Sequence, residues 1–355
     1  MRARGEPPKG SRVVRLDPDR FLSRRRRAHL RRWDVTETAD EVLFARTDDG
    51  WHVALSRYRT QVTRRHPVLL IHGLGANRLA WDLGPEVSLA SWLARRGFDV
   101  FSLDLRGHGR SEKPRLFDPK DWGWSIEEYA TVDVPAALEA VLEVTGAPGV
   151  HAVGHSMGGI LTGRRLAEGD ARIRSAVTVG SALDYSGTKS IFHLAKKLVW
   201  ASWLIWPPVL PMGPAAALMA PFALAFDNAI DRINVHASNV DRRLYRRLVA
   251  TAFHPISVPV LRTLAQAFEP GGLRLADGRT VIEALPEGVP VRSLAGSADT
   301  QCAPEAAARH ATELTAFGEA HGHEDEYGHF DLVMGRRAAR EVWPSVLEWC
   351  VDHDG

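Results

Sequence analysis

The chain has 355 residues, 45% of them hydrophobic, and a formal net charge of +2, which is the composition of an ordinary soluble globular protein. The length suits one large α/β domain with an insertion, or two ordinary domains, and is sufficient to bury a sizeable core. The two cysteines, Cys302 and Cys350, exclude a disulfide framework, lack the spacing of a zinc site and favour a reducing compartment.

The first forty residues, 1–40, are expected to form a basic N-terminal arm. Residues 1–32 contain twelve Lys and Arg against three Asp and Glu, which leaves the remainder of the chain net negative. One interpretation is an electrostatic tether to anionic lipid or nucleic acid. The other, which we favour, is a solvated and partly disordered tail. No apolar stretch follows the basic residues, so no secretory signal peptide is evident and a cytoplasmic location is expected.

From residue 41 the pattern predicts alternating strands and helices. Residues 41–46 and 51–58 predict a hairpin around "TDDG", and the apolar run "PVLLIHG" predicts a parallel strand buried on both faces. Further strands are expected within residues 98–111, 149–154, 172–182, 289–299 and 311–318. Helices are expected at residues 87–97, at 125–146 with a kink at Pro135, at 157–169 and from about Asp331 to Val351. This alternation predicts the α/β class, with a mostly parallel central sheet flanked by helices.

The alternation is interrupted between two strands, which indicates an insertion. Residues 184–287 are predicted to form a mainly helical cap, and residues 41–183 and 288–355 the two parts of the core. The apolar segment Lys196–Phe226 contains five prolines, so no uninterrupted run reaches the ~18–20 residues of a membrane-spanning helix. We expect two or three short helices there, forming an apolar lid.

The stretch G-H-S-M-G, residues 154–158, lies between a predicted strand and a predicted helix. This is the arrangement of a G-x-S-x-G nucleophile elbow. The tight turn forces a positive φ at Ser156 and leaves no space for a side chain at Gly154 or Gly158. Because Ser156 also begins a helix, whose N–H groups favour a developing anion, we predict that it is a nucleophile.

Such a serine needs hydrogen-bond donors for the oxyanion that forms on its substrate. One is predicted to be the backbone N–H of Met157, the residue after the nucleophile. The other is assigned to the N–H of Leu74, in the loop "HGLG" that follows a predicted strand. His72 is expected to brace this loop rather than to transfer protons, and Gly73 is expected to be a structural residue of the same loop.

The serine also needs a base and an acid, which in this fold follow it along the chain. Among fifteen histidines, His329 lies beyond the last strand and before the C-terminal helix, and is the predicted base. Asp299 follows a predicted strand and is the preferred acid, with Asp184 as the alternative. A metal site at His321 and His323 is a less favoured interpretation of a polar loop, and no metal or cofactor is predicted.

Three tryptophans of the cap, Trp200, Trp203 and Trp206, are three residues apart. As functional residues they would line an acyl pocket or insert into a lipid interface. For any one of them we favour the alternative that it packs the cap onto the core. An apolar cap favours a substrate with a hydrophobic acyl part.

The order Ser156, Asp299, His329 resembles that of α/β-hydrolases. Within that superfamily the core resembles the acid lipases of the gastric and lysosomal type. The similar segments are "TDDGWHVALSRYR", "HGLGANRLAWDLGPEVSLASWLARRGFDVF", "WGWSIEEYATVDVPAALEAVLEVTG" and "YGHFDLVMG". The family commonly has Gln where this chain has Met157, and "DLRGHGRS" is similar instead to general esterases.

The resemblance and the residues together predict a serine hydrolase that cleaves carboxylic esters through an acyl-enzyme. The same triad also serves acyl transfer and the cleavage of thioesters or amides. Other classes are a non-catalytic ligand-binding protein and a membrane- or nucleic-acid-associated module that uses the arm. We expect a small-molecule ester as the partner, no nucleic acid, and leave open a peripheral membrane contact through the arm or the cap.

Overall fold

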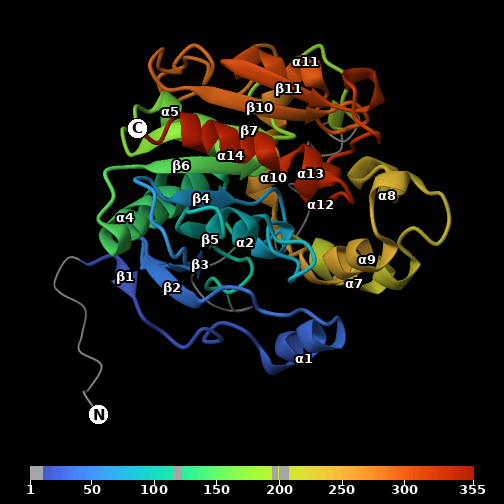
Figure 1. The fold of residues 1–355 in the computed structure, drawn as a ribbon, viewed down its shortest axis with the longest axis horizontal. Coiled ribbons are helices and arrows are strands. Elements are labelled where there is room, and N and C mark those ends of the chain that lie inside the picture. The colour runs from blue at the N-terminus through green and yellow to red at the C-terminus, as the bar shows by residue number, and fades with distance from the viewer. Residues whose placement is uncertain (1–10, 115–121, 194–198, 200–207) are drawn as a thin grey trace.

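A computed structural model describes residues 11–114, 122–193, 199 and 208–355. Within these residues the central sheet has nine strands in the order β1-β2-β3-β5-β4-β6-β7-β10-β11 (Figure 1). From β5 to β11 neighbouring strands are parallel, while β1, β2 and β3 pair antiparallel, so the predicted α/β class is confirmed. The strands are β1 (Val13–Val14), β2 (Glu41–Arg46), β3 (His52–Tyr58), β4 (Val68–Ile71), β5 (Val100–Asp104), β6 (Val150–His155), β7 (Ile173–Val179), β10 (Val291–Gly296) and β11 (Glu313–Phe317).

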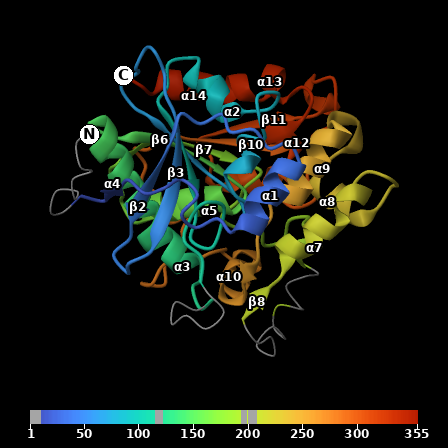
Figure 2. The ribbon, with the colours of Figure 1, turned by 90° about the horizontal axis from the view of Figure 1, so that it is seen from below.

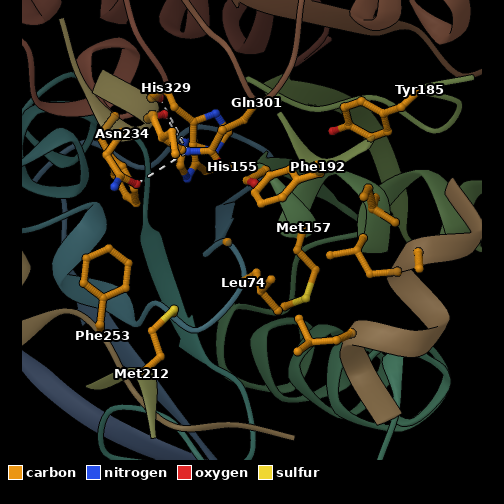
Figure 3. A pocket seen from close by; sticks show the side chains of 18 of the residues that line it. Leu74, His155, Met157, Tyr185, Phe192, Met212, Asn234, Phe253, Gln301 and His329 are labelled. Atoms are coloured by element: carbon orange, nitrogen blue, oxygen red, sulfur yellow. Dashed lines mark hydrogen bonds between the residues drawn. The ribbon is translucent and has the colours of Figure 1, made fainter. Parts of the chain in front are cut away.

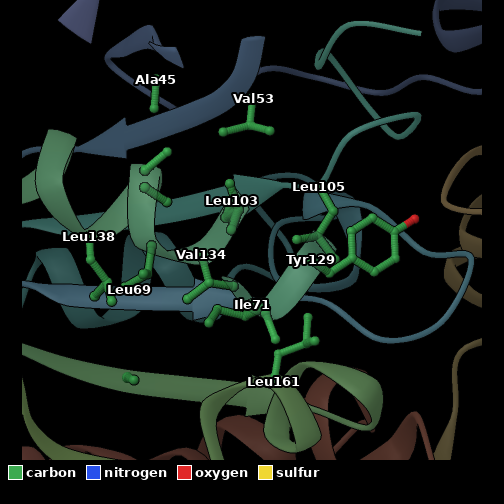
Figure 4. Packing of buried hydrophobic residues seen from close by; sticks show 14 of the residues in the cluster. Ala45, Val53, Leu69, Ile71, Leu103, Leu105, Tyr129, Val134, Leu138 and Leu161 are labelled. Atoms are coloured by element: carbon green, nitrogen blue, oxygen red, sulfur yellow. The ribbon is translucent and has the colours of Figure 1, made fainter. Parts of the chain in front are cut away.

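Helices cover both faces of this sheet, because the side chains of each central strand alternate between two apolar clusters. Leu69 and Ile71 of β4 pack with α4 and α5 on one face (Figure 4), and Val68 and Leu70 pack with α2 and α14 on the other. Full burial of one such aliphatic side chain contributes about 1.5–3 kcal/mol. The core helices are α2 (Leu89–Ala94), α3 (Ile126–Glu128), α4 (Val134–Thr145), α5 (Met157–Ala167), α11 (Pro304–Ala307), α12 (Asp331–Met334), α13 (Ala338–Glu341) and α14 (Trp343–Asp352).

The helix predicted at residues 125–146 is present, but its irregular turn comes before Pro135, about one turn earlier than the predicted kink. A wider π-helical turn at Tyr129–Asp133 separates α3 from α4, and the Val134 N–H reaches back to the Tyr129 carbonyl. Pro135 is the second residue of α4, directly after this turn, and has no N–H to donate to the preceding turn. Its ring would collide with the carbonyl four residues earlier in a regular helix, which accounts for the opened turn.

The single C-terminal helix predicted from about Asp331 to Val351 is wrong. The segment forms three helices, α12, α13 and α14. Gly335 takes an extended conformation with φ −57° and ψ 154°, which ends α12. Pro344 lies in the first turn of α14 because it can only begin a helix, not continue one.

Helices α7, α8 and α9 of the cap lie beyond the carboxyl edge of the sheet, at the right of Figure 1. The described part of residues 184–287 also contains a two-stranded ribbon, β8–β9, which the sequence did not predict. Trp200, Trp203 and Trp206 lie outside the described residues. The described cap elements are β8 (Val209–Leu210), α7 (Met212–Met219), α8 (Ala229–Asn234), α9 (Arg242–Thr251), β9 (Ile256–Ser257) and α10 (Val258–Leu264).

The described part of the N-terminal arm packs on the molecule, in contrast to the solvated tail that we favoured. Its strand β1 pairs with β2, and its helix α1 (Arg24–Arg32) lies beside α9 (Figure 1 and Figure 2). The Arg26 guanidinium donates a hydrogen bond to the Thr251 carbonyl, and His29 Nε2 donates to the Ala250 carbonyl at 2.9 Å. These carbonyls belong to the last turn of a helix, where N–H donors, and the positive charge of Arg26 in particular, are favoured.

None of the helices in the described part of the chain combines the length and the apolar character needed to cross a bilayer.

Candidate active site

Ser156 occupies the sharp turn between β6 and α5. Its φ of +54° and ψ of −122° are those of a strained backbone that few residues other than glycine adopt. A Cβ on Gly154 would lie 2.3 Å from the Gly158 carbonyl carbon, and a Cβ on Gly158 would lie 2.1 Å from the Ile71 oxygen. Both glycines are therefore required for the turn that raises the Ser156 hydroxyl at the carboxyl edge of the sheet.

His329 and Asp299 form a buried hydrogen-bonded pair. His329 Nδ1 donates to Asp299 Oδ2 at 2.8 Å, and the other carboxylate oxygen accepts the N–H groups of Gln301 and Cys302 at 2.8 and 3.0 Å. This arrangement places the proton on Nδ1 and leaves Nε2 as the basic atom of the ring. The structure gives no hydrogen bond between Ser156 Oγ and His329 Nε2 among the described residues, although both side chains line the same cavity.

The alternative acid, Asp184, is engaged elsewhere. One of its carboxylate oxygens lies 3.0 Å from Arg309 Nη1, and the other accepts the Ser186 N–H at 2.8 Å. The hydrogen-bond partner of His329 is thus Asp299, the acid preferred from the sequence, and not Asp184.

Gly180 lies directly against the His329–Asp299 pair, and the sequence analysis did not identify it. It follows β7 with a φ of +54°, and a Cβ at this position would lie 3.1 Å from both Asp299 Oδ2 and His329 Nδ1. Any side chain at this position would therefore displace the two atoms that form the His329–Asp299 hydrogen bond. The only sequence signal was a glycine at the carboxyl end of a predicted strand.

Two backbone N–H groups near Ser156 are available for an oxyanion. Leu74 and Met157 line the same cavity as Ser156, and neither N–H donates a hydrogen bond within the described residues. A Cβ on Gly73 would lie 3.0 Å from Ser156 Cβ, so the loop that carries Leu74 lies directly against the serine. The geometry brings together the two donors assigned from the sequence.

His72 fixes this loop. Its Nδ1 donates to the Gly73 carbonyl at 2.9 Å, and its Nε2 accepts the Leu105 N–H at 3.1 Å. Burial lowers the pKa of His72, which keeps the ring neutral and its two nitrogens in these separate roles. The side chain has no free nitrogen for proton transfer, in keeping with the bracing role expected for it.

His155, the residue before the serine, was not singled out from the sequence. Its Nε2 donates to the carbonyl of His329 at 3.1 Å, and the two rings lie 4.6 Å apart. Burial, and then the neighbouring His329, hold the pKa of His155 well below its usual range. A neutral His155 thus holds the backbone of His329 in place without competing for its proton.

Asp331 was also missed, and it links the cap to the loop that carries His329. One carboxylate oxygen accepts the N–H groups of Gly328 and His236 at 2.6 and 2.7 Å. The Phe330 N–H donates to the carbonyl of Asn234, so two main-chain positions of the cap are tied to this loop. Burial, against these backbone donors, raises the pKa of Asp331 to about 7. The sequence alone indicates that Asp331 lies near His329, because the two are two residues apart. It gives no indication of the cap residues that Asp331 contacts.

A cavity of about 550 Å³ opens between the core and the cap at the serine. His155, His329, Asn234 and Gln301 lie together at one end of it (Figure 3). Ser156 also lines the cavity, and most of the other lining side chains are apolar. The cap contributes side chains that the sequence did not single out: Phe192, Leu210, Met212, Ile230, Ile233, Phe253, Leu261, Leu264 and Phe268. The cavity can hold an aliphatic or aromatic group against the serine.

His321 and His323 do not belong to any group of three metal-ligating side chains within the described residues. His321 is exposed, and His323 Nδ1 lies 3.3 Å from the Gly318 carbonyl oxygen.

Residues 66–245 match the family described as "alpha/beta hydrolase fold", which is half of the chain. Among sequence relatives, the lipase lipl-3 of Caenorhabditis elegans is 33% identical over 175 residues, which cover 44% of this chain and 43% of that protein. The gastric triacylglycerol lipase of Rattus norvegicus is 34% identical over 122 residues, covering 32% of this chain and 31% of that enzyme. The matched part thus spans less than half the length of these relatives.

Solved structures with the same fold cover nearly the whole chain. A soluble variant of the monoglyceride lipase of Saccharomyces cerevisiae has a TM-score of 0.60 and 18% identity, covering 90% of this chain and 96% of that one. The monoacylglycerol lipase of Paleococcus ferrophilus has a TM-score of 0.55 and 20% identity, covering 85% of this chain and 99% of that one. At these identities the likeness shows the fold.

Proposed function

The chain belongs to the alpha/beta hydrolase fold family, and from this premise we propose that it is a serine hydrolase that cleaves carboxylic esters with an apolar acyl group. The observation that carries the proposal is the cavity. It is lined by Ser156, His329, Leu74 and Met157, and over most of the rest by apolar side chains. The sequence relatives named above are lipases, which supports ester cleavage.

The proposed first half-reaction forms an acyl-enzyme. His329 Nε2 takes the proton of the Ser156 hydroxyl as its oxygen attacks the ester carbonyl. The negative charge that develops on the carbonyl oxygen is stabilised by the N–H groups of Leu74 and Met157. When the tetrahedral intermediate collapses, the C–O bond to the leaving alcohol breaks, and His329 returns the proton to that alcohol.

The second half-reaction releases the acid. A water molecule gives its proton to His329 Nε2 and attacks the acyl carbon, and the proton then passes to Ser156 as the acid leaves. Asp299 holds the imidazole in the tautomer that both halves need and stabilises the imidazolium. Acyl transfer to another acceptor would use the same first half-reaction.

The experiment is fluorophosphonate labelling combined with hydrolysis of nitrophenyl esters of increasing acyl length, for the wild type and Ser156→Ala. We expect labelling at Ser156 and a rise of kcat/KM with acyl length until the cavity is filled. Labelling that persists in Ser156→Ala would overturn the nucleophile. Equal kcat/KM at all lengths would contradict the apolar acyl site.

A peripheral membrane contact is a second proposal, and the exposed side chains of the cap support it. Leu218, Phe222, Phe226 and Ile230 are large, apolar and exposed, and Ile230 also lines the cavity at the serine. The exposed arginines of α1, next to α9, would add attraction to anionic lipid: Arg24, Arg25, Arg31 and Arg32. Co-sedimentation with anionic and neutral vesicles tests this, and equal absence of binding to both would contradict it.

A further inference from the structure

A second group of histidine and aspartate side chains meets at the opposite, amino edge of the sheet. His66 precedes β4, His151 is the second residue of β6, and Asp354 follows α14. Both histidines are buried, and Asp354 Oδ1 lies 3.1 Å from His66 Nδ1 and 3.4 Å from His151 Nε2. Three segments far apart in the chain therefore converge on one carboxylate oxygen.

The separations between these atoms suit a small divalent cation. Zinc binds imidazole nitrogen and carboxylate oxygen at about 2.0–2.1 Å, and a tetrahedral arrangement then places ligand atoms about 3.3–3.4 Å apart. The separations of 3.1 and 3.4 Å from Asp354 Oδ1 are close to this value, and all three ligand atoms lie within 4.8 Å of one another. To bind one ion, the two nitrogens, which lie within 4.8 Å of each other, must come to about 3.3–3.4 Å apart.

The surroundings orient the ligands and leave room for a fourth one. His151 Nδ1, the nitrogen that points away from Asp354, lies 2.8 Å from Ser175 Oγ, the kind of outer contact that fixes a ligating imidazole. The carboxylate of Asp354 is held by the backbone N–H groups of Arg65 and His66 at 3.1 and 2.8 Å. Of the three proposed ligands, His66 lines a neighbouring cavity of about 270 Å³, which Arg65, Arg174 and Gly149 also line and from which a water molecule could reach the ion.

The end of helix α14 also favours a positive charge. Helix α14 ends at Asp352, two residues before Asp354, and the carboxyl end of a helix carries partial negative charge. The site lies at the end of β6 opposite to Ser156. A cation bound there would therefore stabilise the folded chain and would not contact the reacting atoms.

We propose that His66, His151 and Asp354 form a structural site for a divalent transition metal, zinc by its ligand preference, which ties the last residues of the chain to the sheet. The site is independent of the proposed ester hydrolysis. An ion there crosslinks the segment before β4, the strand β6 and the segment after α14, and so stabilises the folded state by mass action.

The test uses the full chain, treated with a chelator, dialysed and titrated with Zn²⁺ in a calorimeter and with Co²⁺ in a visible spectrometer. We expect one Zn²⁺ per chain, a melting temperature that rises with Zn²⁺, and the intense visible bands of four-coordinate Co²⁺. Asp354→Asn keeps a hydrogen-bond acceptor but removes the anionic ligand, and is expected to weaken Zn²⁺ binding at least tenfold. Ser175→Ala is expected to weaken it about tenfold through the orientation of His151.

The matched control is His321→Ala, which removes an exposed histidine and should bind Zn²⁺ as the wild type does. The proposal is overturned when the wild type takes up no stoichiometric Zn²⁺, which would leave a hydrogen-bonded cluster only. It is also overturned when Asp354→Asn, or Ser175→Ala where the former does not fold, binds with wild-type affinity. None of these readouts depends on esterase activity.

Discussion

The two edges of the central sheet carry the same kinds of side chain in opposite surroundings. At the carboxyl edge, His329 and Asp299 lie beside Ser156 and an apolar cavity of about 550 Å³. At the amino edge, His66, His151 and Asp354 lie beside a smaller cavity of about 270 Å³.

The difference teaches that the environment, and not the residue type, decides what a histidine–aspartate contact can do. At the carboxyl edge α5 begins at Met157 and offers unpaired N–H groups, which favour an anion. At the amino edge α14 ends near Asp354, where the partial charge has the opposite sign and favours a cation. Strand polarity thus separates the site proposed for catalysis from the site proposed for stability.

The largest effect is expected at the carboxyl edge, from Ser156→Ala. Loss of the nucleophile should lower kcat by about 10⁴-fold or more, because the remaining groups bind the substrate but form no acyl-enzyme. Ester hydrolysis and fluorophosphonate labelling measure this. Activity at the wild-type level would show that Ser156 is not the nucleophile and that the carboxyl edge does not carry the reaction in this way.

Asp299→Asn should lower kcat by about 10⁴-fold at most. Its amide oxygen would stay with the Gln301 and Cys302 N–H groups, so the amide NH2 would face His329 Nδ1 and favour the wrong imidazole tautomer. Asp184→Asn is the matched control, because that carboxylate contacts Arg309 and not His329. We expect its kcat to stay within a few fold of the wild type, and the opposite ranking of the two variants would refute the assignment.

Gly180→Ala tests how tightly the histidine–aspartate pair is held. The new Cβ would press on both Asp299 and His329, and a displacement of the order of 1 Å costs about 10²-fold in kcat/KM. Gly187→Ala is the control, since its φ of +67° imposes similar backbone strain with nothing within 4 Å of the new Cβ. Equal losses of kcat/KM in both variants would attribute the effect to strain alone.

Asp331→Asn should change the pH dependence of stability. A carboxyl whose pKa is raised to about 7 in the folded state binds more protons there than in the unfolded chain between about pH 4 and pH 7. Its contribution to the free energy of unfolding therefore falls as pH rises through this window, by up to about 1.4 kcal/mol per pH unit.

The asparagine variant should lack that decline, which denaturant unfolding at several pH values measures. An unchanged slope in Asp331→Asn would show that Asp331 titrates as an ordinary carboxyl group. A reduced kcat/KM would in addition support its role in positioning the His329 loop.

The smallest effect on catalysis is expected from the amino edge. His151→Ala removes a buried hydrogen bond to Ser175 and a part-buried one to Asp354, and should lower the free energy of unfolding by about 1–3 kcal/mol. The kcat/KM of the folded fraction should change less than in Gly180→Ala. A larger loss of kcat/KM in His151→Ala than in Gly180→Ala would show that the amino edge of the sheet affects catalysis at the carboxyl edge.

Much of the carboxyl edge was predictable because it is encoded locally or by chain order. The elbow residues Gly154, Ser156 and Gly158 are adjacent, and Asp299 and His329 each follow a recognisable strand. The supporting contacts of Gly180 and Asp331 were not predictable, because each depends on segments that meet only in the folded chain.

The pattern of apolar residues and glycines by itself determined the α/β class, the strand-to-helix elbow and the order Ser156, Asp299, His329, since periodicity and backbone strain are local properties. Only the tertiary structure decided which carboxylate faces His329, which cap side chains line the cavity and how α1 packs against α9. It also brought His66, His151 and Asp354 together. These contacts join residues far apart in sequence, and their distances are set by packing of the sheet, its helices and the cap, which no short stretch of sequence specifies.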